Sequence, residues 1–297
     1  MRLAGVLLLL AVAGAQPAAA DCAALHEKIR AFSADPGSVA DAQALNRSVI
    51  AEATCDGAYR ETAGRVIAYA VLRGAQASGD PDAETVRAIA ALGRPWPVLA
   101  ALGDAEYVAG RYVPAVQAYE EALDDLRDVK RNPKAPPRAV EERLAKRAYQ
   151  ARALAPSFVA MKRSFRGGPA GIANVKFRTF TAEAVPVPIR FDYDSARLTP
   201  DGEKAVLDIK QHLAAEGAKG VVLIGHTDPR GSDGYNDRLS LARAQAVADA
   251  LTALGYGGKV AVKGAGKRER FVPDDPGAHD PEQLFAFDRR VEFQIAP

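Results

Sequence analysis

One short segment of the chain combines a carboxylate and a guanidinium that the sequence places near each other. Residues 225–251 begin where an apolar run, residues 221–224, ends, and that run predicts a buried strand. A loop rich in Gly, Asp and Ser leads into an amphipathic helix, and Arg243 lies on the same apolar face as Leu239. A guanidinium on such a face is unfavourable unless an anion pairs with it, and Asp228 is the nearest candidate. The pattern predicts a binding site, with a structural ion pair between loop and helix as the alternative.

The remaining polar residues of the chain do not form a catalytic set. His226 could serve as an acid, a base or a metal ligand, but no second His, Cys or Glu stands at metal-ligand spacing. We therefore interpret it as a packed strand residue. The four histidines show none of the spacings of zinc hydrolases. We expect no enzyme activity, no metal site and no cofactor. The formal net charge of +2 also gives no reason to expect nucleic-acid binding.

The segment resembles the OmpA-like peptidoglycan-binding domain, a family found in outer-membrane porins and peptidoglycan-associated lipoproteins. The residues that match the family pattern, in order, are Gly225, His226, Thr227, Asp228, Gly231, Asn236, Leu239, Ser240, Arg243, Ala244 and Val247. An upstream strand ending in Phe191 and Asp192, and a late run from Asp288 to Val291, extend the resemblance over residues 184–296. Asp288 is a departure, because the family usually has Asn at that position.

The resemblance implies a ligand, the diaminopimelate side chain of the peptidoglycan stem peptide. The end of that side chain carries an ammonium and a carboxylate on one carbon. By resemblance, Asp228 would accept from the ammonium and Arg243 would bind the carboxylate in a bidentate manner. The family implies further ligand contacts from Asn236, Leu239, Asp192, Arg230 and Tyr235. Charge-assisted bonds in a shallow site predict weak, reversible binding. For Arg289 and Arg290, a structural role and a ligand contact both remain open.

The beginning of the chain predicts export. Residues 1–20 combine Arg2, a leucine-rich run and an alanine-rich end, which is typical of a cleaved signal peptide. No later apolar run is long enough for a transmembrane segment. Cys22 follows the predicted cleavage site, but Asp21 stands where bacterial lipoprotein signals need a small residue, so we do not expect lipidation. The prediction is a protein of the Gram-negative periplasm that is associated with the cell wall or the outer membrane.

The two cysteines of the chain, Cys22 and Cys55, both lie in the predicted exported N-terminal region. In an oxidising compartment the simplest arrangement is one disulfide between them, and two unpaired thiols are the alternative. Chain-entropy arguments give such a loop closure about 3 to 4 kcal/mol of stabilisation.

Residues 21–155 predict an all-α domain, because Ala, Leu, Glu and Arg are plentiful and β-branched runs are few. Within it, residues 102–123 resemble a tetratricopeptide repeat. The small residues Gly103 and Ala115 would let two antiparallel helices approach closely, with Tyr119 filling the gap. A helical array of this kind usually presents a protein-binding surface, so we expect a protein partner. A plain helical bundle that only spaces the C-terminal domain is the alternative.

The sequence predicts a signal peptide and two domains. They are the signal peptide over residues 1–20, an all-α tetratricopeptide-like array over 21–155, a linker over 156–183 and an OmpA-like domain over 184–297. In the last domain, strands expected at 187–193, 219–225, 259–263 and 291–295 are separated by helices after Thr199 and over 236–254. This order predicts an α/β (α+β) domain with a mixed sheet and helices on one face. The binding loop would follow the second strand at its carboxyl end.

These features predict a non-catalytic function. The C-terminal domain would bind peptidoglycan non-covalently in the periplasm and so anchor a helical protein-interaction domain to the cell wall. The alternative is a periplasmic scaffold whose OmpA-like domain is structural and does not bind peptidoglycan.

Overall fold

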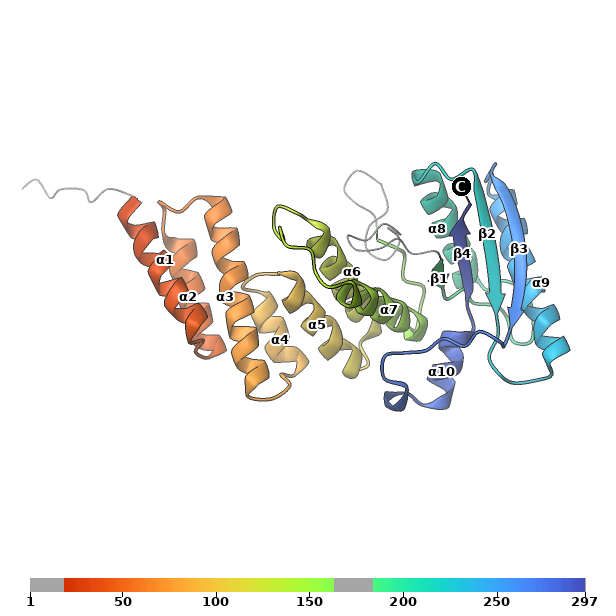
Figure 1. Ribbon diagram of the computed structural model, residues 1–297, viewed down its shortest axis with the longest axis horizontal. Helices are drawn as coiled ribbons and strands as arrows, with labels where there is room; N and C mark the ends of the chain where they lie inside the picture. The colour runs from red at the N-terminus through yellow and green to blue at the C-terminus, as the bar shows by residue number, and fades with distance from the viewer. Residues whose placement is uncertain (1–18, 163–183, 297) are drawn as a thin grey trace, which may run out of the picture. The chain divides into compact units, whose positions relative to one another are not determined.

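The computed structural model of the protein describes residues 19–162 and 184–296. Nearly all of the predicted signal peptide and most of the predicted linker therefore lie outside the described residues. The chain divides into two compact units, residues 1–80 and 81–297, which are considered separately below. The second unit holds helices α4 to α7 together with the C-terminal sheet (Figure 1). The domain boundaries at residues 155 and 184 stay a prediction.

The described part of the first unit consists of helices and their connections. The helices are α1 (Ala19–Ala34), α2 (Val39–Ala51) and α3 (Gly57–Ala77). Ser38 forms a capping box at the start of α2, and the Asp56 side chain accepts from a backbone N–H in the first turn of α3. A disulfide joins Cys22 of α1 to Cys55, just before α3, with the two Cα atoms 5.7 Å apart. This confirms the disulfide expected from the sequence.

The second unit begins with a further group of helices. They are α4 (Ala83–Ala90), α5 (Trp96–Val108), α6 (Tyr112–Arg127) and α7 (Arg138–Leu154). Helices α5 and α6 approach closely because Gly103 has no side chain, and a Cβ there would lie 2.5 Å from Cε1 of Tyr119. The Tyr119 ring is fully buried, and its hydroxyl donates to Asp104 Oδ1 over 2.8 Å. The region is helical as expected, while its tetratricopeptide-like arrangement stays a prediction.

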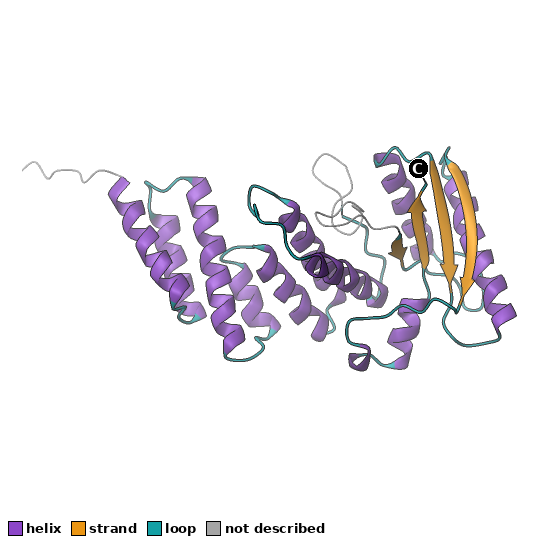
Figure 2. Cartoon of the chain, in the orientation of Figure 1, coloured by secondary structure: helices purple, strands orange, loops and turns teal. Residues whose placement is uncertain are grey.

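The C-terminal part of the second unit is built on a four-stranded mixed sheet in the order β1-β4-β2-β3. Its strands are β1 (Val185–Val187), β2 (Gly220–His226), β3 (Lys259–Gly266) and β4 (Val291–Ile295). Strands β2 and β3 are parallel, whereas β4 runs antiparallel to both β1 and β2. Helices α8 (Pro200–Ala215) and α9 (Asp233–Ala253) lie on one face of the sheet (Figures 1 and 2). The predicted mixed sheet is confirmed.

The first strand is shorter than the expected 187–193 and begins earlier, at Val185. Strand β1 stops at Val187, and beyond it only an isolated bridge joins Phe191 to Leu198. Pro188 has no backbone N–H with which to continue the ladder, which is a physical reason for the early end. The chain then turns back, and Asp192 N donates to the carbonyl of Arg197 over 2.9 Å. This turn carries the residues that later form one side of the candidate site.

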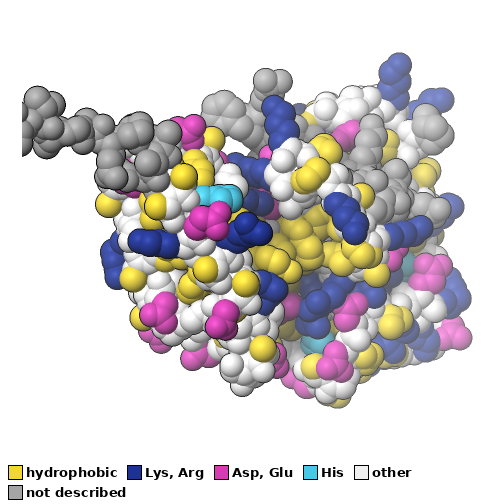
Figure 3. All heavy atoms as spheres, turned by 60° about the vertical axis from the view of Figure 1, so that its left-hand side comes forward, with side chains coloured by type: hydrophobic (Ala, Val, Ile, Leu, Met, Phe, Trp, Pro, Cys, Tyr) yellow, Lys and Arg dark blue, Asp and Glu magenta, His cyan; other side chains and the backbone are white. Residues whose placement is uncertain are grey.

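A single hydrophobic core fills the space between the sheet and its two helices. The periodic apolar residues of the sequence meet there, and their side chains are buried: Val206, Ile209 and Leu213 of α8, Val221 and Leu223 of β2, and Val247 and Leu251 of α9. The chain also has a short 3-10 helix, η2 (Pro276–Ala278), and a helix α10 (Pro281–Asp288) between β3 and β4. On the face shown in Figure 3, basic and acidic side chains are intermingled.

Helix α9 lies directly against the backbones of β2 and β3. A Cβ at Gly225 would overlap the carbonyl oxygen of Ser240, and a Cβ at Gly264 would lie 2.8 Å from the backbone nitrogen of Leu241. The hydroxyl of Ser240 accepts from Gly266 N over 3.0 Å, which joins the helix to the end of β3. Glycines at these positions therefore fix the helix at close range to the loop that follows β2.

The start of the predicted linker packs against the C-terminal sheet domain. Phe158 N donates to Asp201 Oδ2 over 3.0 Å, and Met161 is buried in the core described above. Nearby, the hydroxyl of Tyr149 in α7 donates to the carbonyl of Phe287 in α10 over 2.6 Å, and both rings are buried in one cluster. Helix α7 and helix α10 are thus joined by a buried contact.

We expect Gly225→Ala to lower the free energy of unfolding by about 1 to 3 kcal/mol, the usual penalty of overpacking. The new methyl group would force α9 away from β2, because the Ser240 carbonyl leaves no room for it. Urea unfolding of the full chain, followed by circular dichroism, measures the change. Gly257→Ala is the matched control, since no atom lies within 4 Å of a Cβ built there. Equal stability of the two variants would contradict the close packing.

Candidate functional site

A cavity of about 770 Å³ opens at the carboxyl end of β2. Among its walls are all seven residues that the sequence predicts to contact a ligand: Asp192, Asp228, Arg230, Tyr235, Asn236, Leu239 and Arg243. They come from the turn after β1, the loop after β2 and helix α9. The walls also include Phe191, Tyr193, Asp194, Thr227, Gly231, Glu282 and Arg289. The fold thus brings the predicted residues together, and their role in ligand binding stays a prediction.

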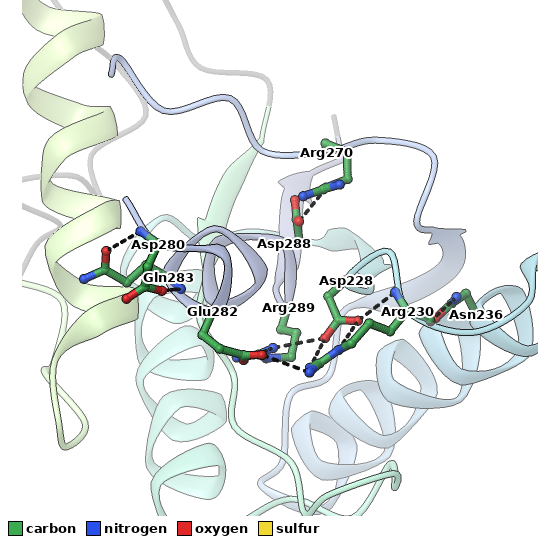
Figure 4. Close-up of polar contacts among 9 residues, drawn as sticks. All are labelled: Asp228, Arg230, Asn236, Arg270, Asp280, Glu282, Gln283, Asp288 and Arg289. Atoms are coloured by element: carbon green, nitrogen blue, oxygen red, sulfur yellow. Dashed lines mark hydrogen bonds and ion pairs between the residues drawn. The ribbon is translucent and has the colours of Figure 1, made fainter. Parts of the chain in front are cut away.

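The Asp228 carboxylate is nearly buried, with 9% of the residue exposed, and it is fully hydrogen-bonded. Its Oδ1 accepts from the backbone N and the Nε of Arg230, at 3.1 and 3.2 Å. Its Oδ2 accepts from Arg230 Nη2 at 2.8 Å and from Arg289 Nη1 at 3.0 Å (Figure 4). Burial alone would raise the pKa of Asp228, but the bonds from Arg230 and Arg289 outweigh it and hold the pKa below its ordinary value. The carboxylate is ionised, and its four acceptor positions are occupied.

Arg243 has a different environment from the one expected. Its Nε donates to the carbonyl of Ser195 over 3.1 Å, and its guanidinium carbon lies 5.0 Å from the centre of the Phe191 ring. Burial lowers the pKa of the guanidinium, and repulsion from Arg289 lowers it further. Within residues 19–162 and 184–296, no carboxylate forms an ion pair with Arg243. The direct Asp228–Arg243 ion pair, which the sequence left as an alternative, is therefore not formed between these residues.

Helix α10 adds a further acidic residue, Glu282, to the site. Glu282 Oε1 lies 3.0 Å from Arg230 Nη1, and Glu282 Oε2 lies 4.0 Å from Arg289 Nη1 (Figure 4). Sequence reasoning missed Glu282 because it is 54 residues from Asp228 along the chain and stands in a polar segment without a motif. Only the packing of α10 beside the β2 loop brings the two together. Two of the carboxylates in the site, those of Asp228 and Glu282, therefore share the guanidiniums of Arg230 and Arg289.

The structure separates the two neighbouring arginines before β4. Arg289 lines the cavity and donates to Asp228, as described above. Arg290 is buried, with its Nε donating to Glu292 Oε1 over 2.8 Å and its terminal nitrogens donating to the Glu269 carbonyl. The two side chains therefore lie in different environments although they are neighbours in the sequence. One arginine belongs to the cavity and the other to the sheet.

Asn236 and Tyr235 hold the walls of the cavity in place. Asn236 is buried, and its Nδ2 donates to the carbonyls of Arg230 and Ser232 at 2.8 and 3.1 Å. The Tyr235 hydroxyl donates to Asp194, which has a left-handed backbone conformation with a φ of 52°. These bonds fix the loop after β2 and the turn after β1 relative to each other. Asn236 therefore also has a structural role, whether or not it contacts a ligand.

Asp192 and Tyr193 stand at the edge of the cavity. The Asp192 carboxylate pairs with Arg197 within the same turn. The Tyr193 side chain is almost completely exposed, at 97%, although it is large and aromatic. Sequence reasoning did not select Tyr193, since nothing in its local sequence distinguishes it from a packed strand residue. Its exposure provides an apolar surface beside the charged groups.

Asp288, the departure from the family pattern, is buried at the end of α10. It accepts from Arg270 Nε over 2.5 Å (Figure 4), and also from Phe271 N over 2.8 Å. Burial raises the pKa of this carboxyl above its ordinary value, against the opposing effect of those two bonds. This contact joins the segment after β3 to the residue that directly precedes Arg289. Asp288 therefore stabilises the wall of the cavity, but its own side chain does not line the cavity.

Residues 19–162 and 184–296 contain no group of three His, Cys, Asp or Glu side chains that could hold a metal ion. In the same residues, every helix is too short or too polar to cross a bilayer.

The C-terminal part of the chain is similar to known proteins. Residues 190–283 match the model of the OmpA family. Outer membrane protein A of Shimwellia blattae is 38% identical over 82 residues, which cover 27% of this chain and 34% of that protein. The corresponding protein of Klebsiella pneumoniae is 37% identical over 82 residues, covering 27% and 24%. The chain spans about a third or less of these two relatives. Its C-terminal part is an OmpA-like domain.

Solved structures are similar over the same region. The peptidoglycan-associated lipoprotein of Burkholderia pseudomallei is 27% identical, covers 38% of this chain and 89% of its own, and has a TM-score of 0.31. The cell wall anchor of the T6SS of Pseudomonas aeruginosa is 30% identical, covers 38% and 79%, and has the same TM-score. Both similarities are confined to little more than a third of the chain.

His226, at the end of β2, gives the domain a specific sensitivity to acid. It is buried, with Nε2 3.7 Å from Glu292 Oε1, and burial followed by repulsion from Arg290 lowers its pKa to about 4. The unfolded chain takes up the proton more readily, so stability is full above about pH 6.5 and falls as the pH drops towards 4. We expect a loss of up to about 3 kcal/mol from this group. Urea unfolding at pH 7.5 and 4.5 should show a smaller loss for His226→Gln than for the wild type. The same loss in both proteins would contradict the assignment.

Proposed function

We propose that this protein binds peptidoglycan non-covalently, through the zwitterionic centre of diaminopimelate in the stem peptide. The observation that carries the proposal is the pairing pattern in the cavity. A half-buried guanidinium, Arg243, has no carboxylate partner among the described residues, and an ionised carboxylate, Asp228, lies in the wall of the same cavity. A ligand that carries both charges on one carbon fits this arrangement. The role is one of binding and involves no reaction.

The ligand carboxylate would bind to Arg243. The bond from Nε to Ser195 fixes the guanidinium, and the Phe191 ring supports its face. Among the described residues the Nε bond is the only hydrogen bond of this side chain, so its terminal nitrogens are available for a bidentate contact. A carboxylate there would also relieve the repulsion between Arg243 and Arg289. Arg243 is therefore the main determinant of affinity for the anionic half of the ligand.

The ligand ammonium would bind to Asp228, but only by exchange. All four acceptor positions of the carboxylate are in use, three of them by Arg230. The Arg230 side chain is 53% exposed, and an exposed ion pair contributes little, so its guanidinium can give way to the ligand. Glu282 already binds Arg230 Nη1 and would retain it. In the free protein the Arg230 side chain thus occupies the position where the ligand ammonium would bind. The need to displace this side chain favours weak, reversible binding.

We further propose the setting for this activity. The protein would be exported by its signal peptide, would remain without a lipid anchor, and would act in the periplasm at the cell wall or outer membrane. The helical region would bind a protein partner and so be attached to the wall by the OmpA-like domain. The alternative is a scaffold whose OmpA-like domain is a structural part and does not bind peptidoglycan. The experiment below distinguishes between these two functions.

Asp228→Asn and Arg243→Ala should each weaken binding by about ten- to a hundredfold, the loss of one charge-assisted contact. Retention on insoluble peptidoglycan and titration with soluble meso-diaminopimelate, observed by NMR, provide the two measurements. Arg238→Ala is the matched control, because Arg238 is an exposed arginine of α9 that does not line the cavity. Circular dichroism verifies that each variant is folded. Wild-type retention by an Asp228→Asn, Arg243→Ala double variant would favour the structural scaffold instead.

A further inference from the structure

A second cavity, of about 360 Å³, lies beside the first. The two cavities share Phe191, Arg243 and Arg289 as wall residues. The second one also reaches Arg190, in the segment after β1, which does not line the first. Arg243 therefore borders both spaces.

The charges around the two cavities are different. The wall of the first contains four carboxylates together with three guanidiniums, which suits a zwitterion. The wall of the second contains three guanidiniums, those of Arg190, Arg243 and Arg289, and no carboxylate among its described residues. Such a surface favours an anion, and guanidinium groups bind carboxylates in a defined, two-bond geometry.

The three guanidiniums are held in place but not fully neutralised. Arg190 Nη1 donates to the Pro156 carbonyl over 2.8 Å and Nη2 donates to the Ala155 carbonyl, so the chain that follows α7 fixes this side chain. The nearest carboxylate to Arg190, that of Asp201, is 3.5 Å away and also pairs with Lys204. Arg289 shares Asp228 with Arg230. An incoming carboxylate would complete the pairing of a preformed cationic group.

The walls of this cavity come from parts of the chain that are far apart. Ala153 of α7 and Ala286 of α10 form part of its surface, and their small side chains leave the space open. The buried Tyr149–Phe287 contact holds these two helices together. The cavity therefore depends on the helical region as well as on the OmpA-like domain. A sheet domain without α7 would lack this wall.

We propose that the second cavity binds a second carboxylate of the same stem peptide, the α-carboxylate of the glutamate that precedes diaminopimelate. The inference rests on the proposed function, because it requires the diaminopimelate centre to bind at Arg243 in the first cavity. The glutamate is joined through its side chain, so its α-carboxylate is free and lies one residue from the zwitterion. The protein would then discriminate between stem peptides by the charge at that position.

Three soluble probes test this inference with the full chain. They are meso-diaminopimelate, the tripeptide L-Ala-γ-D-Glu-meso-diaminopimelate, and the same tripeptide with its glutamate α-carboxyl group amidated. We expect the acid tripeptide to bind about ten- to a hundredfold more tightly than the amidated one, as for one added charge-assisted bond. Equal binding of the two tripeptides would overturn the second cavity while leaving the proposed function in place. If none of the three probes binds, the proposed function fails as well.

Two variants locate the effect in the second cavity. Arg190→Gln removes one of its guanidiniums, and we expect the preference for the acid tripeptide to disappear. Because Arg190 also fixes residues 155 and 156, a second variant, Ala286→Asp, places a competing carboxylate in the cavity without removing those bonds. Arg238→Gln is the control and should keep the full preference. Persistence of the preference in both folded variants would overturn the assignment.

Discussion

The contact between the backbone of α9 and the ends of β2 and β3 is the constraint on which the site depends. Ser240 lies against Gly225 and Gly264, and no side chain larger than hydrogen fits between the strands and the helix there. Arg243 follows Ser240 by less than one turn, while Asp228 follows Gly225 by three residues. The short distance between helix and strands therefore places both charged groups in the wall of one cavity, although they belong to different elements.

The charges in this cavity are distributed unevenly. The acidic side is saturated, because Asp228 accepts from Arg230 and Arg289 with all of its acceptor positions. The basic side is not, because the half-buried Arg243 pairs with no carboxylate of the described residues and also faces repulsion from Arg289. In the proposed binding mode, the anionic half of the ligand would meet a guanidinium whose terminal nitrogens are available, while the cationic half would have to displace an arginine. This difference is the reason that we propose reversible binding.

Helix α10 connects the site to the helical region. Its Glu282 binds Arg230 at the cavity, and its Phe287 is buried against Tyr149 of α7. Arg289, directly after the helix, holds Asp228. A single short helix therefore has contacts with both the charged network and the packed helices. The position of the acidic network consequently depends on packing outside the part of the chain that matches the OmpA family model.

The sequence alone determined the helical N-terminal region from local composition, the mixed sheet from the order of strands and helices, and the Cys22–Cys55 disulfide from the presence of only two cysteines. It selected Asp228 and Arg243 because strand, loop and helix follow one another directly between them, and the resemblance to the OmpA-like family added the other five residues that share the cavity. Only the tertiary structure decided which groups pair with each other. Asp228 binds Arg289, 61 residues later, and Arg230 binds Glu282, 52 residues later. Ion pairs over such separations depend on how packed elements meet, and local propensity carries no information about that.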